Sequence, residues 1–130
     1  MPLYHSTKFA IEGFSESLHW ELAQIGVKVK IVEPGGVATD FSGRSFDFQH
    51  NQELTEYNDF VGQFMEVMSK MDPRRLSTPE MIADIIYTAA TDEAETLRYR
   101  AGADSEQVLT ARETMSDEDF FTMWKKQLGM

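Results

Sequence analysis

A tyrosine and a lysine stand four residues apart near the start of the sequence, as Tyr4 and Lys8. On a helix this spacing puts both side chains on one face, one turn apart. A phenol can give a proton to a carbonyl oxygen or take one from an alcohol, and a neighbouring ammonium stabilises the phenolate. The pair suits proton transfer at a carbonyl, although both residue types are common on helices and the spacing alone is a weak signal.

The strength of that stabilisation depends on how well the pair is shielded from water. Two unit charges about 4 Å apart attract by roughly 4 kcal/mol at an effective dielectric of 20, but by only about 1 kcal/mol in bulk water. We therefore expect Lys8 to activate Tyr4 as a base only inside a closed site. In carbonyl reduction the neutral phenol is already the acid that the reaction needs.

A long amphipathic helix is predicted to carry the pair, over about residues 6–24. Apolar residues recur there every three or four positions, which is the spacing of a helix with one buried stripe. They are Ile11, Phe14, Leu18, Leu22 and Ile25. Because Phe9 and Trp20 widen the stripe, we expect the helix to pack on a sheet and on a neighbouring subunit. Gly26 can take the left-handed conformation that ends helices.

A strand is predicted over residues 27–32, where valine and isoleucine alternate with lysine. It must end at Pro34-Gly35-Gly36, because proline offers no ladder donor and paired glycines favour a turn. Thr39 follows this turn. At the C-terminal end of a parallel strand, such a turn sits where open α/β sheets bind ligands.

This order of helix, strand and Pro-Gly-x-x-x-Thr turn resembles the classical short-chain dehydrogenase/reductase family. The residues that carry the resemblance are Tyr4, Lys8, Ala10, Leu18, Glu21, Leu22, Gly26, Val29, Val32, Pro34, Gly35 and Thr39. The likeness is strong over residues 4–41 and looser over residues 97–102. It implies an α/β fold that is the C-terminal portion of a Rossmann-type doubly wound parallel sheet. The N-terminal half is expected to be absent, because classical members carry a glycine-rich fingerprint, a serine and an asparagine upstream of the tyrosine.

The resemblance also implies an NAD(P)-dependent oxidoreductase that interconverts a small-molecule alcohol and a carbonyl. Tyr4 would be the catalytic acid–base, and Lys8 its electrostatic partner and a contact to the nicotinamide ribose. Backbone groups after the Pro-Gly would hold the nicotinamide carboxamide, and the threonine hydroxyl would contact the cofactor. The cofactor-binding residues implied in this way are Lys8, Pro34, Gly35, Val37 and Thr39. The choice between NAD and NADP is made by residues of the absent half.

Without a glycine-rich loop there is no pyrophosphate cradle at a helix N-terminus, so we expect the isolated chain to be inactive unless the missing half is supplied. The alternative is a non-catalytic oligomerisation or interaction remnant that pairs with full-length relatives. The complete enzyme is expected to be a homo-oligomer. Two strands of a parallel sheet would leave open edges and uncovered apolar faces, which predicts aggregation.

The rest of the chain divides into a substrate-covering region, residues 42–76, and a C-terminal region, residues 77–130, after a first region of residues 1–41. A helix is predicted over residues 54–71, with an apolar face that would be core, dimer contact or substrate lining. That face comprises Tyr57, Phe60, Val61, Phe64, Met68 and Met71. The C-terminal region should hold a helix capped by Thr78 and reaching about residue 90, the last strand over residues 96–99, and a tail helix starting at Ser116.

Composition narrows the classes of function. The chain has 130 residues and a net charge of −10 from 22 acidic and 12 basic residues, which argues against nucleic-acid binding. It has no cysteine, so disulfides and thiolate chemistry are excluded. The three histidines lack metal-ligand spacing, so no metal site is expected. No apolar stretch approaches membrane-spanning length, and a cytoplasmic setting is expected.

Overall fold

The computed structural model describes residues 1–70 and 72–129. Its helices and strands, in chain order, are α1 (Pro2–Ala23), β1 (Ile31–Pro34), α2 (Asn58–Ser69), α3 (Pro79–Thr91), β2 (Arg98–Ala101), α4 (Ala103–Thr114) and α5 (Asp117–Leu128). Single-turn 3-10 helices lie at Asp40–Ser42, Thr55–Tyr57 and Pro73–Arg75. The described residues thus form mostly helices around one small parallel sheet, which confirms the mixed α/β class.

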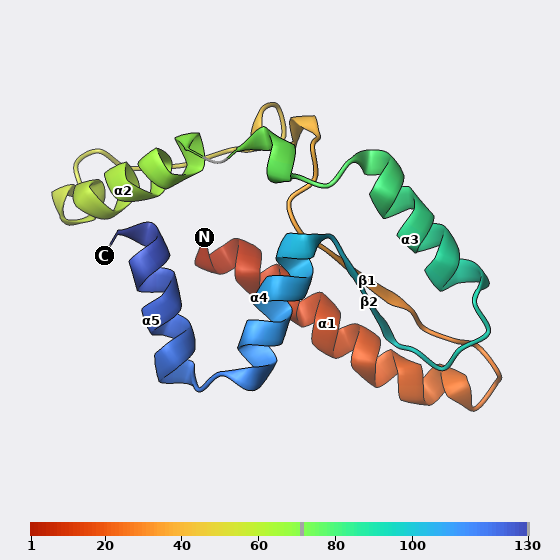
Figure 1. The fold of residues 1–130 in the computed structure, drawn as a ribbon. Coiled ribbons are helices and arrows are strands. Elements are labelled where there is room, and N and C mark those ends of the chain that lie inside the picture. The colour runs from red at the N-terminus through yellow and green to blue at the C-terminus, as the bar shows by residue number, and fades with distance from the viewer. Residues whose placement is uncertain (71, 130) are drawn as a thin grey trace.

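The sheet has two parallel strands, β1 and β2, with Ile31 opposite Arg98 and Pro34 opposite Ala101. Helix α3 packs against both strands and α4 packs against β2. In Figure 1 the strand pair runs between α1 and α3. The other edge of β1 has no strand beside it within the residues that the structure describes. A parallel sheet is normally covered on both faces, and an open strand edge leaves unpaired N–H and C=O groups that another strand could meet.

The core is small and lies where the strands meet α3 and α4. Its buried apolar residues are Ile31, Ala89, Ala101 and Ala111. Two serines, Ser77 and Ser105, are buried beside them. Three of the four apolar positions are alanine, so the helices approach the strands closely without contributing much apolar side-chain area. Ala101, Ser77 and Ser105 lie at or beside the carboxyl end of the sheet, whereas Ile31 lies at its amino end.

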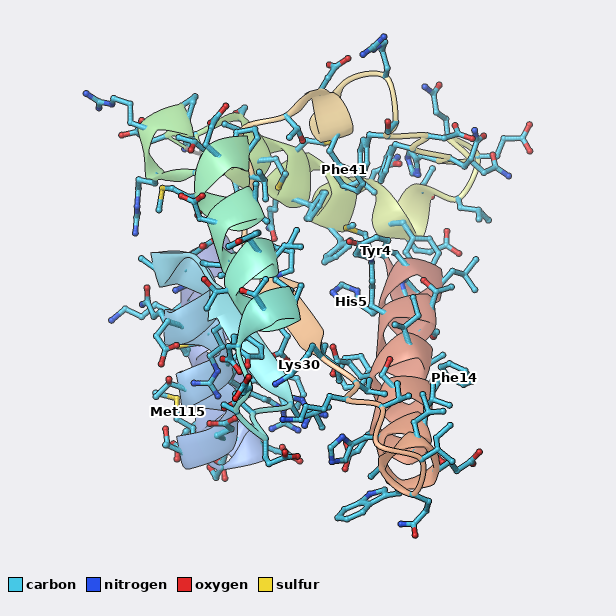
Figure 2. The ribbon with its side chains drawn as sticks, turned by 90° about the vertical axis from the view of Figure 1, so that its right-hand side faces the viewer. Tyr4, His5, Phe14, Lys30, Phe41 and Met115 are labelled. Atoms are coloured by element: carbon cyan, nitrogen blue, oxygen red, sulfur yellow. The ribbon has the colours of Figure 1, made fainter. Side chains whose placement is uncertain are left out.

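Helix α1 contains no buried residue. It is tied to the sheet by charge, because the Arg98 guanidinium lies 3.4 Å from the Glu12 carboxylate and 2.9 Å from that of Glu16. The predicted apolar stripe is instead largely open to solvent, with Ile11 56% and Phe14 66% exposed. Figure 2 shows Phe14 pointing away from the other elements. Leu18 and Leu22 of the stripe are half-buried, whereas Ile25 is exposed like Ile11 and Phe14. The prediction that the stripe packs on the sheet is therefore wrong for its exposed residues, because Glu12 and Glu16 face Arg98 of β2.

Both strands lie further along the chain than predicted. The first occupies Ile31–Pro34 and not residues 27–32, and the second Arg98–Ala101 and not residues 96–99. The segment before β1 faces a loop and not a strand. Lys28 forms an ion pair with Glu95, and the Lys30 ammonium donates to the Thr96 carbonyl at 2.9 Å. Lysine alternation therefore reflects contacts to that loop, and the ladder starts only where the Ile31 N–H reaches the Leu97 carbonyl.

The predicted helix starts in the C-terminal region are confirmed. The Thr78 hydroxyl accepts from the Met81 N–H at 3.2 Å at the start of α3, and the Ser116 hydroxyl accepts from the Asp119 N–H at 3.1 Å at the start of α5. Helix α4 was not predicted from the sequence. The helix predicted over residues 54–71 is a 3-10 turn followed by α2, and Met71 lies outside the described residues. Helices α2 and α5 lie together at one end of the molecule, far from α3 (Figure 1).

Among the helices described, none combines the length and the apolar character that crossing a membrane would require.

Candidate functional site

The first turns of α1 carry Tyr4 and Lys8 on one face, as the spacing predicts. The Lys8 ammonium lies 5.5 Å from the centre of the Tyr4 ring, within the range of a cation–π contact. Tyr4 is 41% exposed and Lys8 is also exposed. His5 turns back to the start of the helix, with its Nδ1 3.0 Å from the Met1 carbonyl oxygen. In this setting water screens the charge of Lys8, so the pair has the alignment that the spacing predicts but lacks shielding from water.

The turn after β1 is held by backbone hydrogen bonds on two sides. The Gly35 N–H donates to the Ala101 carbonyl of β2 at 3.0 Å. On the other side, the Gly36 carbonyl accepts from the Ser77 N–H at 2.9 Å, and the Ala38 N–H donates to the Ser77 carbonyl at 2.9 Å. Ser77 precedes α3 and is only 6% exposed. The turn is thus fixed by its own chain, at the carboxyl end of the sheet.

Both glycines of the turn are required by close approach of other side chains. The Gly36 N–H donates to the Asp104 carboxylate at 2.6 Å. A Cβ at Gly35 would fall on that same carboxylate, and a Cβ at Gly36 would lie 2.6 Å from the Leu76 side chain. Neither backbone conformation is left-handed, so the need for glycine here is one of space and not of φ.

The turn presents two hydrogen-bond donors that its own chain does not use. The Gly36–Val37 peptide is trans, so the Val37 N–H points opposite to the Gly36 carbonyl and therefore away from Ser77. Within the described residues this N–H makes no hydrogen bond. The Thr39 hydroxyl oxygen accepts from the Phe41 N–H at 3.4 Å, which leaves its own hydrogen free to donate. This donor set fits a carboxamide or phosphate oxygen, the groups that a nicotinamide nucleotide offers. Pro34 contributes no donor and marks the end of the strand.

Phe41 brings the loop that follows the turn to the start of α1. Its ring centre lies 6.4 Å from that of Tyr4 with the ring planes tilted by 52°, and Figure 2 shows the two side chains near each other at that helix end. The structure therefore groups Tyr4, Lys8 and Phe41 at one place, and groups Gly35 with Val37 in the fixed turn. The two groups are joined through the short loop over residues 38–41, and no hydrogen bond or ring contact among the described residues runs directly from Tyr4 to the turn.

Three residues of this arrangement were not singled out by the sequence reasoning: Phe41, Ser77 and Asp104. The signal for Asp104 was available, because Gly102 followed by acidic residues at positions 104 and 106 is typical of a helix start. It was missed because α4 has few apolar residues and shows no clear stripe. Ser77 gives no signal in the sequence, since its role comes from the bridge that it forms with Val37.

Comparison with known proteins places this geometry in a family. The short chain dehydrogenase family model matches residues 1–50, which include Tyr4, Lys8 and the whole turn. An uncharacterized oxidoreductase of Schizosaccharomyces pombe is 39% identical over 129 residues, 98% of this chain and 52% of that protein. An oxidoreductase of Botryotinia fuckeliana is 35% identical over 117 residues, 89% of this chain and 42% of that protein.

Retinol dehydrogenase 16 of Rattus norvegicus is 30% identical over 112 residues, 78% of this chain and 35% of that protein. The chain thus spans about half the length, or less, of these curated relatives. The match to the fungal proteins extends beyond the family model to nearly the whole chain, so the likeness includes α3, β2 and α4 as well as the turn. The chain belongs to the short-chain dehydrogenase family.

Proposed function

We propose that this chain carries the acid–base and nicotinamide side of an NAD(P)-dependent oxidoreductase that interconverts an alcohol and a carbonyl. The observation that carries the proposal is the contact between Tyr4 and Phe41, with Lys8 beside the same ring. It brings the loop after the turn against the residue best suited to proton transfer. The relatives named as oxidoreductases and as a retinol dehydrogenase support the same class of reaction.

In this proposal the turn binds the nicotinamide end of the cofactor. The free Val37 N–H would donate to the carboxamide oxygen, and the Thr39 hydroxyl to a neighbouring oxygen of the nucleotide. Lys8 would hold the ribose. When bound, the cofactor supplies or accepts a hydride. The unshared donors of the turn support this role, because a backbone N–H at the end of a strand is normally paired or solvated.

Tyr4 would give its proton to the carbonyl oxygen during reduction, and would take a proton from the alcohol during oxidation. Lys8 would stabilise the phenolate by its positive charge. Since the pair is exposed in this chain, efficient use of that charge requires cover from water. We therefore propose that turnover needs residues equivalent to the part of the relatives that the chain does not match, which would close the site and cradle the pyrophosphate.

A chimaera tests the proposal directly. Residues 1–130 replace the matching segment of the Schizosaccharomyces pombe relative, and oxidation of NADH and NADPH is followed with a panel of ketones and aldehydes. The expected result is turnover by the chimaera, and little or none by the 130-residue chain alone. Absence of turnover in a folded chimaera whose unmodified parent is active would contradict the proposal. Turnover by the chain alone would show that no further cover is needed.

A second candidate is a non-catalytic interaction module, and the bare face of α1 favours it. Phe9 is 74% exposed and Trp20 is 69% exposed, which is costly for a face without a partner. This candidate predicts a defined oligomer that does not bind the cofactor. Sedimentation of the purified chain, combined with titration of NADH, separates the two candidates.

A further inference from the structure

Asp104 lies in the first turn of α4, but its carboxylate hydrogen-bonds outside that helix. The helix begins after Gly102 without a side-chain cap, so the Asp104 carboxylate makes no capping bond to it. Its Oδ2 instead accepts from the Gly36 N–H at 2.6 Å, across 68 positions of sequence. Charge-assisted hydrogen bonds of this length are the stronger ones in proteins. The side chain is therefore directed at the turn after β1.

The second carboxylate oxygen gives an independent indication. Asp104 Oδ1 is buried and, among the described residues, has no hydrogen-bond partner. It occupies the space where a Cβ at Gly35 would lie, and it is also close to the Cβ position of Gly102. Burying a carboxylate oxygen without a partner destabilises a fold. This cost is understandable where the carboxylate holds a backbone segment in a required orientation.

The orientation that it holds is that of the proposed cofactor donor. Asp104 fixes the N–H of Gly36, and Ser77 fixes the carbonyl of the same residue. The Gly36 carbonyl held by Ser77 directs the Val37 N–H to the opposite side, because the two groups belong to one trans peptide. Asp104 holds the peptide before it, so that both peptides around Gly36 are fixed. We infer that Asp104 is a positioning residue, which sets the direction of the Val37 N–H toward the nicotinamide carboxamide. The inference about the cofactor rests on the proposed function. The hydrogen bond from the Gly36 N–H to Asp104, which we call the anchor, rests on the geometry.

The first test concerns the anchor alone and uses the full 130-residue chain labelled with 15N. Amide hydrogen exchange at Gly36 is compared between the unaltered chain, Asp104→Ala and Asp104→Asn. Alanine removes the acceptor, so Gly36 should exchange at least about tenfold faster. Asparagine keeps an oxygen acceptor of the same size and should retain most of the protection. Equal exchange at Gly36 in the unaltered chain and in Asp104→Ala would overturn the anchor.

Glu106→Ala is the matched control. Glu106 is the other acid in the first turn of α4, but it lies 3.2 Å from the Arg100 guanidinium and does not reach the turn. The Glu106→Ala substitution removes the same charge from the same helix end as Asp104→Ala does. A general weakening of α4 should therefore appear in both alanine variants. Only Asp104→Ala should change exchange at Gly36. An equal change in Glu106→Ala would show that Asp104 acts merely through the stability of the helix.

The second test concerns the cofactor. Nicotinamide mononucleotide in its reduced form is titrated into each variant, because it carries only the part of the cofactor that the turn would hold. Amide shifts at Val37 and Thr39 report binding, and the apparent affinity should fall about tenfold in Asp104→Ala, with recovery in Asp104→Asn and no change in Glu106→Ala. Unchanged affinity in Asp104→Ala overturns the positioning role. No shift in the unaltered chain contradicts the proposed function, while the exchange data still decide the anchor.

Discussion

The turn after β1 and the start of α1 carry the two halves of the proposed chemistry, and they are stabilised in opposite ways. The turn is bonded to β2, to Ser77 and to Asp104, next to the buried residues of the chain. The start of α1 has no buried residue, and the ring of its tyrosine has aromatic or cation–π contacts with His5, Lys8 and Phe41. The difference teaches that the chain fixes the turn proposed to face the cofactor by its own contacts, whereas the proposed acid–base pair is left exposed to water.

The largest effect, on kcat, is expected at the exposed start of α1. In the chimaera, Tyr4→Phe should lower kcat for carbonyl reduction by about 10²- to 10⁴-fold, because it removes the proton donor and leaves the ring. His5→Ala, one residue away, should change kcat only slightly, since its ring nitrogen is engaged with the Met1 carbonyl. Initial rates at saturating cofactor give both values. Similar losses in the two variants would mean that the helix end matters and the phenol does not.

The next effect is expected in the bonded turn. Gly35→Ala places a methyl group on the Asp104 carboxylate and breaks its hydrogen bond to Gly36, so the free energy of unfolding should fall by about 1–3 kcal/mol. Urea unfolding followed by circular dichroism measures the change. If the variant is as stable as the unaltered chain, the turn is looser than the contacts around it indicate.

The same substitution in α1 should have the reverse sign. A Cβ at Gly13 meets no atom within 4 Å, and alanine favours a helix interior over glycine by about 0.5–1 kcal/mol. Gly13→Ala should therefore stabilise the chain by about that amount in the same urea experiment. A destabilised Gly13→Ala would reveal a close partner for this side of the helix, and the contrast between the two regions would then fail.

The smallest effect is on the pH dependence of stability, and it concerns Glu33, which lies on β1 near Glu12 of α1. Glu33 lies on β1 with its side chain 16% exposed, 3.8 Å from Arg98. Burial, with repulsion from Glu12 next, raises the pKa of the Glu33 carboxyl above its usual range, and the nearby arginines only partly oppose this. A carboxyl with a raised pKa binds its proton more readily in the folded state, so its contribution to stability falls as pH rises from about 4.5 toward 7.

Glu33→Gln removes that dependence. It should be more stable than the unaltered chain at pH 7 by less than about 1 kcal/mol, since water screens part of the effect, and the gain should shrink toward pH 4. Asp92, whose pKa is lowered chiefly by the Tyr99 hydroxyl, loses stability as pH falls in both proteins and cancels in the difference. A gain that grows on acidification would show that the pairing with Arg98 outweighs burial.

The sequence was informative where local chemistry decides the structure. Thr78 and Ser116 start α3 and α5 as predicted, because a hydroxyl that accepts from an N–H three residues later needs no distant partner. The Tyr4–Lys8 alignment also follows from helix geometry alone. The glycine turn was placed correctly after β1, since proline and paired glycines end a strand in any context.

The errors occurred where distant residues decide. The bounds of β1 depend on where β2 begins, so the alternation over residues 27–32 could not set them. The side of α1 that faces the strands is chosen by Arg98, which lies more than 80 positions away from Glu12 and Glu16. Asp104 and Ser77 act on the turn only through the folded chain. The roles of the predicted cofactor residues stay predictions until a nucleotide is titrated.

The unpaired side of β1 has a practical consequence. A parallel strand with one open side can accept a further strand from another polypeptide, in register with its free N–H and C=O groups. The chain is therefore suited to split-protein complementation, in which a separately produced piece of a relative adds a strand beside β1. Recovery of the proposed activity on mixing would then report assembly of the two pieces. Co-expression of both pieces would be the first method to try for a sample that does not aggregate.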